Sequence, residues 1–221
     1  MNIFPSLAPL ALTAAALTAL PTHAGGLDSL NRFLKDTRSG KAAFTQVVTQ
    51  PPKEGRAAAQ KTSSGTFEFS RPGQFRFHYE KPFEQTIVAD GQTLWLYDVD
   101  LNQVTARKQE QVLDATPAAI VAAAPDLKTL EKTFDLADEP DQAGLQWLRA
   151  TPKTREAQIQ NIRVGFTPAT ASAPAVLTTL EITDSFGQRS VLTFTNFHPN
   201  PALPPETFRF RPPAGADVIR N

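Results

Sequence analysis

The sequence predicts a mainly β fold of the α+β class, in which short antiparallel strands form a sheet that curls on itself. Three observations predict this class. Residues 65–106 alternate apolar and polar side chains at the period of two that is typical of strands. Pro72-Gly73 and Asp90-Gly91 separate these runs as hairpin turns. Helical periodicity is confined to short stretches within residues 27–40 and 116–134.

The first 24 residues have the features of a secretory signal peptide. They contain no Lys, Arg, Asp or Glu, residues 7–20 are largely Ala, Leu and Thr, and Thr22-His23-Ala24 fits the small-x-small cleavage pattern. Pro9 interrupts the apolar stretch, which is short for a stable membrane span. We expect cleavage after Ala24 to leave residues 25–221 as one exported, soluble domain.

Charge and cysteine content limit the classes of function. The chain carries 22 basic and 22 acidic side chains and no Cys. A net charge of zero provides no basic footprint for nucleic acid or for an anionic membrane. The lack of Cys excludes thiol catalysis and a lipid anchor on a cysteine after the signal, and a domain of this size folds without disulfides. We expect a monomer that binds no nucleic acid.

The first elements after the signal are a helix and a strand. Apolar residues recur at helical spacing over residues 27–34, which predicts a short amphipathic helix that ends near Gly40. Residues 42–49 alternate and predict a strand. Residues 51–61, which begin with two prolines, predict a loop.

An aromatic wall follows, and it is the central feature of the chain. Alternation places Phe67 and Phe69 on one face of a strand, and it places Phe75, Phe77 and Tyr79 on one face of the next. Arg71 has the same parity as the first pair, so this cation must reach the rim of the sheet or find a partner there. We interpret the stretch as the wall of an apolar concave surface with Arg71 on its lip.

A second helical region precedes the remaining strands. Thr116 and Pro117 fit the N-cap and first helical positions, residues 118–124 are apolar all round, and Pro125 stops or kinks the helix. Leu127, Leu130 and Phe134 share one side of a further turn or two. Because apolar helices this short are unstable alone in water, we expect this region to lie against the aromatic wall.

The last third of the chain returns to strands. Strand patterns occupy residues 145–148, 159–166, 176–182 and 190–197, with a hairpin turn at residues 184–187. Phe208 and Phe210 alternate with Arg209 and Arg211, which continues the strand pattern up to Pro212-Pro213. Neither an internal repeat nor a linker divides the chain.

The polar residues do not assemble into a recognisable catalytic or metal-binding motif. His78 lies on the strand face opposite the Phe set, and both it and His198 are best interpreted as surface histidines, although a carboxylate could complete a zinc site. Asp90, Asp98 and Asp100 fit turns better than paired acid–base chemistry. G-x-S-x-G, G-x-G-x-x-G and P-loop patterns do not occur. We predict no enzyme activity, no cofactor and no bound metal.

The remaining candidate for function is the apolar surface itself. An ordinary core would explain many of these residues. However, the chain has 15 Phe against two Tyr and two Trp, so most of the aromatic surface has no polar atom. The apolar helix at residues 118–124 needs a cover or an occupant, and Arg71 sits where that helix could meet the wall. These features favour binding of an apolar ligand.

Residues 71–105 closely resemble the periplasmic carriers of outer-membrane lipoproteins, the LolA family. The shared features are Arg-Pro, the Phe run, Asp-Gly and Leu-Trp in the same order. Agreement continues at Phe44-Thr45-Gln46, at Thr116-Pro117 and at residues 207–213, so the resemblance covers most of residues 27–219. It implies an unclosed barrel of about eleven antiparallel strands, with short helices that form a lid over a hydrophobic cavity.

The resemblance also implies a function, partners and site residues. Such carriers accept triacylated lipoproteins from an inner-membrane ABC transporter, shield the acyl chains and deliver them to LolB, the outer-membrane lipoprotein receptor. LolB shares the fold but has an anchoring Cys, which this chain lacks. The implied lid contacts are Arg71, Leu34, Val121 and Ala122. The implied acyl-chain contacts are Phe75, Phe77 and Ile87, to which the shared strand face adds Phe67 and Phe69.

Two alternatives stay open at this point. The first is a lipid-sensing regulatory domain of the cell envelope with the same type of barrel, although such regulators carry a further C-terminal domain. The second is a secreted lipid hydrolase, which would need a nucleophile and a base that no motif in the chain supplies.

Overall fold

The computed structural model of the chain describes residues 25–52, 57–109, 124–154 and 158–220. In chain order the described elements are α1 (Gly26–Asp36), β1 (Ser39–Thr49), β2 (Gln60–Ser70), β3 (Gln74–Lys81), β4 (Gln85–Asp90), β5 (Thr93–Asp98), β6 (Gln103–Lys108), α4 (Leu127–Thr133), β7 (Phe134–Gln142), β8 (Leu145–Pro152), β9 (Ile159–Thr167), β10 (Val176–Asp184), β11 (Arg189–Pro199), the 3₁₀ helix η2 (Pro205–Phe208) and β12 (Asp217–Arg220).

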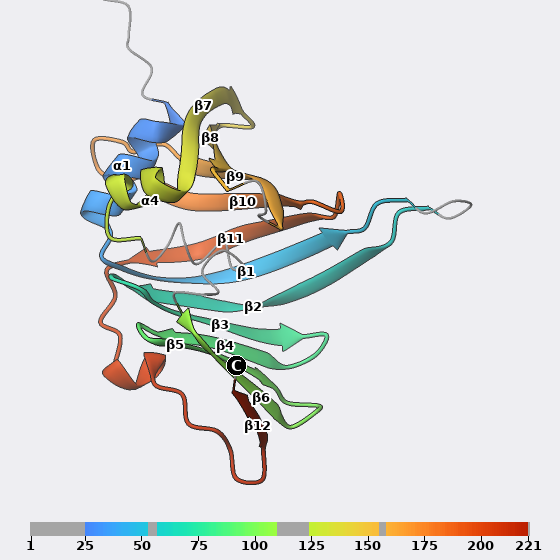
Figure 1. The fold of residues 1–221 in the computed structure, drawn as a ribbon. Coiled ribbons are helices and arrows are strands. Elements are labelled where there is room, and N and C mark those ends of the chain that lie inside the picture. Colours follow the sequence, from blue (N-terminus) through green and yellow to red (C-terminus); the bar gives the residue numbers. More distant parts are fainter. Residues whose placement is uncertain (1–24, 53–56, 110–123, 155–157, 221) are drawn as a thin grey trace, which may run out of the picture.

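The described strands form one curved sheet in the order β12-β6-β5-β4-β3-β2-β1-β11-β10-β9-β8-β7 (Figure 1). The edge strands β12 and β7 do not pair with each other, so the barrel is unclosed. This confirms the predicted fold class, with one departure from an all-antiparallel sheet. The described residues form twelve strands, where about eleven were predicted. β12 pairs with β6 in parallel, while the other neighbours are antiparallel.

Three local predictions also need correction. Phe134 starts β7 instead of ending a helix, because residues 134–142 pair with β8. Phe208 ends a 3₁₀ helix, and residues 209–213 are not in the sheet, so their alternation is not that of a ladder strand. The predicted loop at 51–61 is shorter at its end, since β2 already begins at Gln60. The helix predicted at 116–124 lies outside the described residues except for Ala124.

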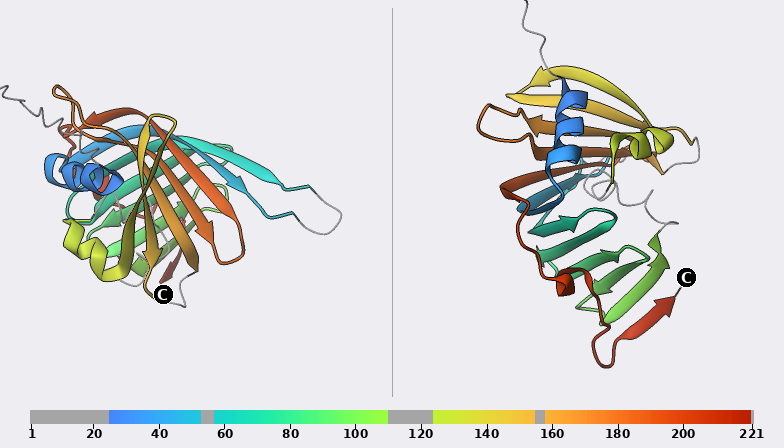
Figure 2. Two further views of the ribbon diagram at one scale, coloured as in Figure 1. Left: turned by 90° about the horizontal axis from the view of Figure 1, so that it is seen from above. Right: turned by 90° about the vertical axis from the view of Figure 1, so that its left-hand side faces the viewer.

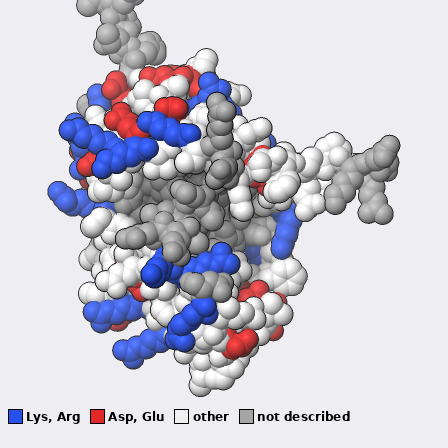
Figure 3. Space-filling model, viewed as in Figure 1, with Lys and Arg blue, Asp and Glu red and all other residues white. Residues whose placement is uncertain are grey.

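Helix α1 fills one half of the concave face. It packs on β7, β8, β9 and β10 and contacts α4 (Figure 2). Its apolar residues Leu30, Phe33 and Leu34 are buried there, whereas its charged residues face outward. In the view of Figure 3, charged side chains gather over this α1–α4 end of the molecule. The amphipathic pattern of residues 27–34 therefore fixes which side of α1 meets the sheet.

Both ends of α1 are tied to distant parts of the chain. At its start, Leu27 N–H donates to Asp138 Oδ1 of β7 at 2.8 Å, which satisfies one of the free amides of the first turn. After its end, Asn200 Oδ1 accepts from Arg38 N–H at 2.7 Å, and Asn200 Nδ2 donates to Asp36 O at 2.8 Å. The joint between α1 and β1 is therefore held by one side chain from the segment after β11.

The C-terminal segment covers the convex face of the other half of the sheet. Helix η2 packs on β3 and β4, and its Phe208 is buried. Phe210 lies against Trp95, with ring centroids 5.6 Å apart. The outward-facing Val88 and Val104 are buried under this cover. Part of the convex face of β3–β6 is thus covered, and their concave face is available for other contacts.

Candidate functional site: the concave face of the sheet

The aromatic wall lies on the concave face, as the alternation predicted. Phe67 pairs with Phe77 across β2 and β3, and their rings stack with centroids 4.3 Å apart. Phe69 and Phe75 are also directly opposite each other on these two strands. Phe33 of α1 reaches the wall at Phe69, with centroids 6.0 Å apart. Such aromatic contacts add to the free energy gained from the buried area itself.

Arg71 joins the wall to Thr37, which follows α1, and to Ala124, which precedes α4. Its Nε donates to Ala124 O at 2.8 Å, and its Nη1 donates to Thr37 O, the residue that follows α1. The guanidinium also lies over the rings of Phe33 and Phe69, 4.9 Å from each centroid. Burial lowers the pKa of Arg71 to about 10, so it remains cationic at neutral pH. We call Arg71, Thr37 and Ala124 the latch.

Gln109 fixes the turn that carries Arg71. This buried side chain donates to Gly73 O at 2.7 Å and accepts from Gly91 N–H at 3.0 Å. Gly73 and Gly91 both have a positive φ, of 75° and 100°, which favours glycine at these turns. Gln109 therefore ties the β2–β3 and β4–β5 turns together beside the latch.

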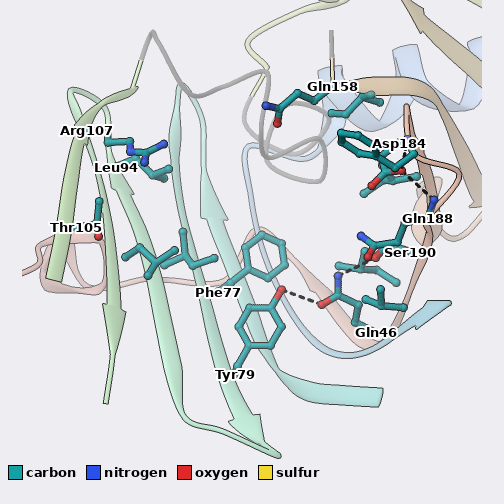
Figure 4. A pocket seen from close by; sticks show the side chains of 17 residues that line it. Gln46, Phe77, Tyr79, Leu94, Thr105, Arg107, Gln158, Asp184, Gln188 and Ser190 are labelled. Carbon is teal, nitrogen blue, oxygen red and sulfur yellow. Dashed lines mark hydrogen bonds between the residues drawn. The ribbon is translucent and has the colours of Figure 1, made fainter. Parts of the chain in front are cut away.

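A cavity of about 540 Å³ opens at the other end of the concave face. Gln46 of β1 lines this cavity. It lies eight residues after Arg38, which is next to the latch, and eight residues of strand span roughly 25 Å. Strands β4 and β5 contribute Ile87, Leu94 and Leu96. In Figure 4, hydrogen-bonding side chains gather on the opposite side, towards β1, β10 and β11.

Three polar side chains in this cavity are linked by hydrogen bonds. Tyr79 Oη donates to Gln46 Oε1 at 3.1 Å, and Gln46 Nε2 donates to Ser190 Oγ at 2.8 Å (Figure 4). Burial raises the pKa of Tyr79 to about 12, so the phenol is neutral at physiological pH. We call these residues the polar triad.

Comparison with known proteins identifies the family of this fold and site. The family described as "Outer membrane lipoprotein carrier protein LolA" matches residues 35–211. The chain belongs to the LolA family. The outer-membrane lipoprotein carrier protein of Albidiferax ferrireducens is 64% identical over 198 residues, which cover 90% of this chain and 92% of that protein. That of Methylibium petroleiphilum is 50% identical, over 94% of this chain and 96% of that protein.

Solved structures support the fold. A LolA superfamily protein from Nitrosomonas europaea matches with a TM-score of 0.50 at 12% identity, over 84% of this chain and 98% of that one. An uncharacterized conserved protein from Thermus thermophilus matches with a TM-score of 0.54 at 13% identity, over 88% of this chain and 98% of that one. Within the described residues, no helix has the length and hydropathy needed to cross a membrane.

The described site residues expected for a LolA family member lie in three different surroundings. Phe77 and Ile87 line the cavity. Phe67, Phe69 and Phe75 do not line it: they are at most 1% exposed and belong to the packed core, as does Leu34 of α1. Arg71 forms the latch, while Val121 and Ala122 lie outside the described residues. The acyl-chain and lid roles of all these residues stay predictions.

The sequence placed Gln46 only within the Phe44-Thr45-Gln46 stretch shared with the LolA family, and it gave no role to Gln46 or to Ser190. Both sit at inward positions of their strands, where Gln46 follows Phe44 and Ser190 precedes Leu192 at the same parity. A polar residue that interrupts an inward apolar series was the available signal. The link between the two could not be read from the sequence, since they are 144 positions apart.

The histidines and the aspartate that were candidates for a catalytic or metal-binding site lie at the surface or hold a turn. His78 Nδ1 lies 3.1 Å from Thr86 Oγ1 on the convex face, and His198 is exposed. Burial alone would raise the pKa of Asp90, but hydrogen bonds from Thr93, Trp95 and Gln92 lower it, as expected for a carboxylate that holds a turn. The described residues contain no group of three His, Cys, Asp or Glu placed to hold a metal ion.

Proposed function

We propose that this chain is a periplasmic carrier that binds the acyl chains of lipoproteins and delivers them to the outer membrane. The observation that carries the proposal is the continuity of the cavity with the aromatic wall. Phe77 lines the cavity and also stacks on Phe67, so an acyl chain in the cavity lies at the edge of a larger apolar surface. The family relationship supports a carrier over a sensing domain or a hydrolase.

The size of the cavity indicates that the carrier must open to load. A volume of about 540 Å³ lies in the range of pockets for one drug-sized ligand. Three acyl chains need more room than this. Each CH₂ group that is removed from water contributes about 0.8 kcal/mol to the free energy of binding. The adjacent space is occupied by Phe33 and the rest of the buried face of α1. We therefore propose that α1 moves away from the wall when cargo enters.

The latch suits a closure that must be reversible. Its hydrogen bonds from Arg71 to two backbone carbonyls are charge-assisted, each contributing about 1.5–3 kcal/mol. Burial of the guanidinium opposes closure, as its lowered pKa reflects. The net free energy of closure is therefore small enough for cargo to shift the equilibrium.

We further propose the partners of each step. The cargo is a triacylated lipoprotein, the donor is the inner-membrane ABC transporter that releases lipoproteins, and the acceptor is the receptor LolB. Residues 1–24 export the chain as a signal peptide, and residues 25–221 act as a single monomeric domain. Transfer from this chain to LolB then requires only that LolB bind the cargo more tightly, so the carrier itself performs no reaction.

The test replaces the cation of the latch. Arg71→Leu removes both carbonyl contacts and makes the rim more apolar, so we expect the folded variant to retain loaded lipoprotein and to transfer less of it to LolB. Arg76→Leu is the matched control, because Arg76 lies on the convex side of β3 in a 3.8 Å ion pair with Glu68. The readout is the fraction of a purified lipoprotein that moves from carrier to receptor.

Two results would contradict the proposal. Equal retention and equal delivery by the Arg71 variant and the wild type would remove the latch from the release step. Failure of the wild-type protein to keep any triacylated lipoprotein soluble would reject the carrier function itself.

A further inference from the structure

The polar triad is unexpected in a cavity for hydrocarbon chains. Acyl chains offer no hydrogen-bonding atoms, and polar groups buried in an apolar site are unfavourable unless they are paired. Yet Tyr79, Gln46 and Ser190 lie together on the cavity lining, between the apolar side chains of Phe77, Val48 and Leu192. We propose that the polar triad binds a carbonyl oxygen of the ester or amide groups that link acyl chains to the lipoprotein, an inference that rests on the proposed carrier function.

The hydrogen-bond count of the polar triad leaves one hydroxyl donor for a ligand. With Tyr79 donating to Gln46 Oε1 and Gln46 donating to Ser190, the Ser190 hydroxyl hydrogen has no acceptor among the described residues. With the Gln46 amide turned over, Ser190 would donate to Gln46, and the Tyr79 hydroxyl hydrogen would be the remaining donor. Either orientation therefore offers one O–H to the cavity.

The charge of the polar triad selects the class of acceptor. All three side chains are neutral, and the raised pKa keeps Tyr79 protonated. A neutral donor matches the carbonyl of an ester or amide, whereas a free carboxylate would gain more from a cation. Arg107 is the cation on the cavity lining, and it lies on the other side of the cavity, on β6 (Figure 4). The carboxylate of Asp184 is already engaged by Phe186 and Gln188 N–H.

This assignment fixes the direction in which cargo lies. A carbonyl at Ser190 places the acyl linkage beside the β10–β11 hairpin, whose tip residue Phe186 is 80% exposed. From there the hydrocarbon extends towards Ile87 and Phe77 and on to the aromatic wall. The protein part of the cargo then leaves the cavity at the hairpin end, away from the latch.

The experiment compares two ligands on matched variants. The probes are a di-O-acylglyceryl cysteine lipopeptide and its ether-linked analogue, which has the same chains without the ester carbonyls. We expect Ser190→Ala or Tyr79→Phe to weaken ester lipopeptide binding about three- to tenfold, the loss of one net hydrogen bond, and to leave binding of the ether analogue unchanged. Ser64→Ala is the control, because Ser64 pairs with the outward-facing Thr45.

Each outcome decides the proposal. If both variants lose affinity equally for the ester and ether ligands, the polar triad supports the cavity structure rather than the carbonyl. If neither variant loses affinity for the ester ligand, the free hydroxyl has no ligand role. If wild-type protein binds the ether and ester ligands equally well, carbonyl recognition is wrong but the carrier function stands. If wild-type protein binds neither, the carrier function fails as well.

Discussion

The two ends of the concave face are built from the same sheet but are packed in opposite ways. At the latched end, α1 packs on β7–β10 and its Phe33 reaches the wall at Phe69, and neither ring has exposed surface. At the cavity end, strands with the same inward alternation enclose about 540 Å³, and the residues that line it include the polar triad. The alternation of inward and outward side chains therefore does not explain the difference in packing between the two ends. Among the residues that the structure describes, a helix covers the latched end and none covers the cavity end, and this is the difference between the two ends.

This difference suggests how stability and function are divided along the sheet. The latched end has the dense contacts that hold the fold, and the cavity end keeps inward positions that make fewer contacts with protein. Burial of polar groups is tolerable at the cavity end because a ligand can pair with them. Substitutions at the two ends should therefore separate: one set should change the free energy of unfolding, and the other should change binding.

The largest effect is expected at the latched end. Phe33→Ala should lower the free energy of unfolding by about 3–5 kcal/mol, because it empties a fully buried ring site between Phe69 and Phe166. Phe186→Ala is the control at the cavity end, where the ring is exposed, and it should change stability by less than about 0.5 kcal/mol. Urea denaturation measures both. A loss of similar size in the two variants would mean that the ends do not differ.

The next effect depends on pH and belongs to the cavity end. The pKa of Tyr79 is raised to about 12 in the folded protein, so its contribution to stability is complete below the ordinary value of about 10 and is lost as pH rises through 12. Wild type should lose about 2 kcal/mol more than Tyr79→Phe between pH 10 and pH 12. The difference between the two curves isolates this residue from other groups. Parallel curves would show that the phenol titrates normally.

The smallest of the three effects should appear in binding alone. Ile87→Glu puts a carboxylate into the apolar side of the cavity, opposite Phe77 and Leu96, and should weaken a fluorescent hydrophobic probe about tenfold or more. Leu101→Glu is the control, because Leu101 is 70% exposed and does not line the cavity. Unchanged probe affinity in a folded Ile87 variant would place the binding surface elsewhere on the molecule.

The sequence was sufficient for features that depend on local periodicity. The alternation of Phe67 and Phe69 with polar residues gave the inward face of β2, and the spacing of Leu30, Phe33 and Leu34 gave the buried face of α1. The parity of Arg71 placed a cation at the rim, where the structure finds it bonded to two carbonyls. These features follow from one element at a time, which is why they could be predicted.

Features that depend on two distant elements could not be predicted in this way. Residues 134–142 contain four acidic side chains, and they form a strand because β8 supplies a partner. Phe33 fills the space over Phe69, so wall residues that could contact acyl chains are covered in this structure, which no alternation pattern reveals. The polar triad likewise requires the curvature of the sheet to bring side chains of β3, β1 and β11 together, although β2 lies between β3 and β1.

The unpaired edges β7 and β12 have a mechanical consequence. The diameter of a closed barrel is fixed by its strand number and stagger, so widening one means breaking ladder hydrogen bonds. An open sheet can instead flatten by a small change of twist at each strand interface, with every ladder intact. The volume enclosed by such a carrier then increases with the size of the cargo, because a larger cargo flattens the sheet further. The return of the flattened sheet to its curved form would favour release of the cargo.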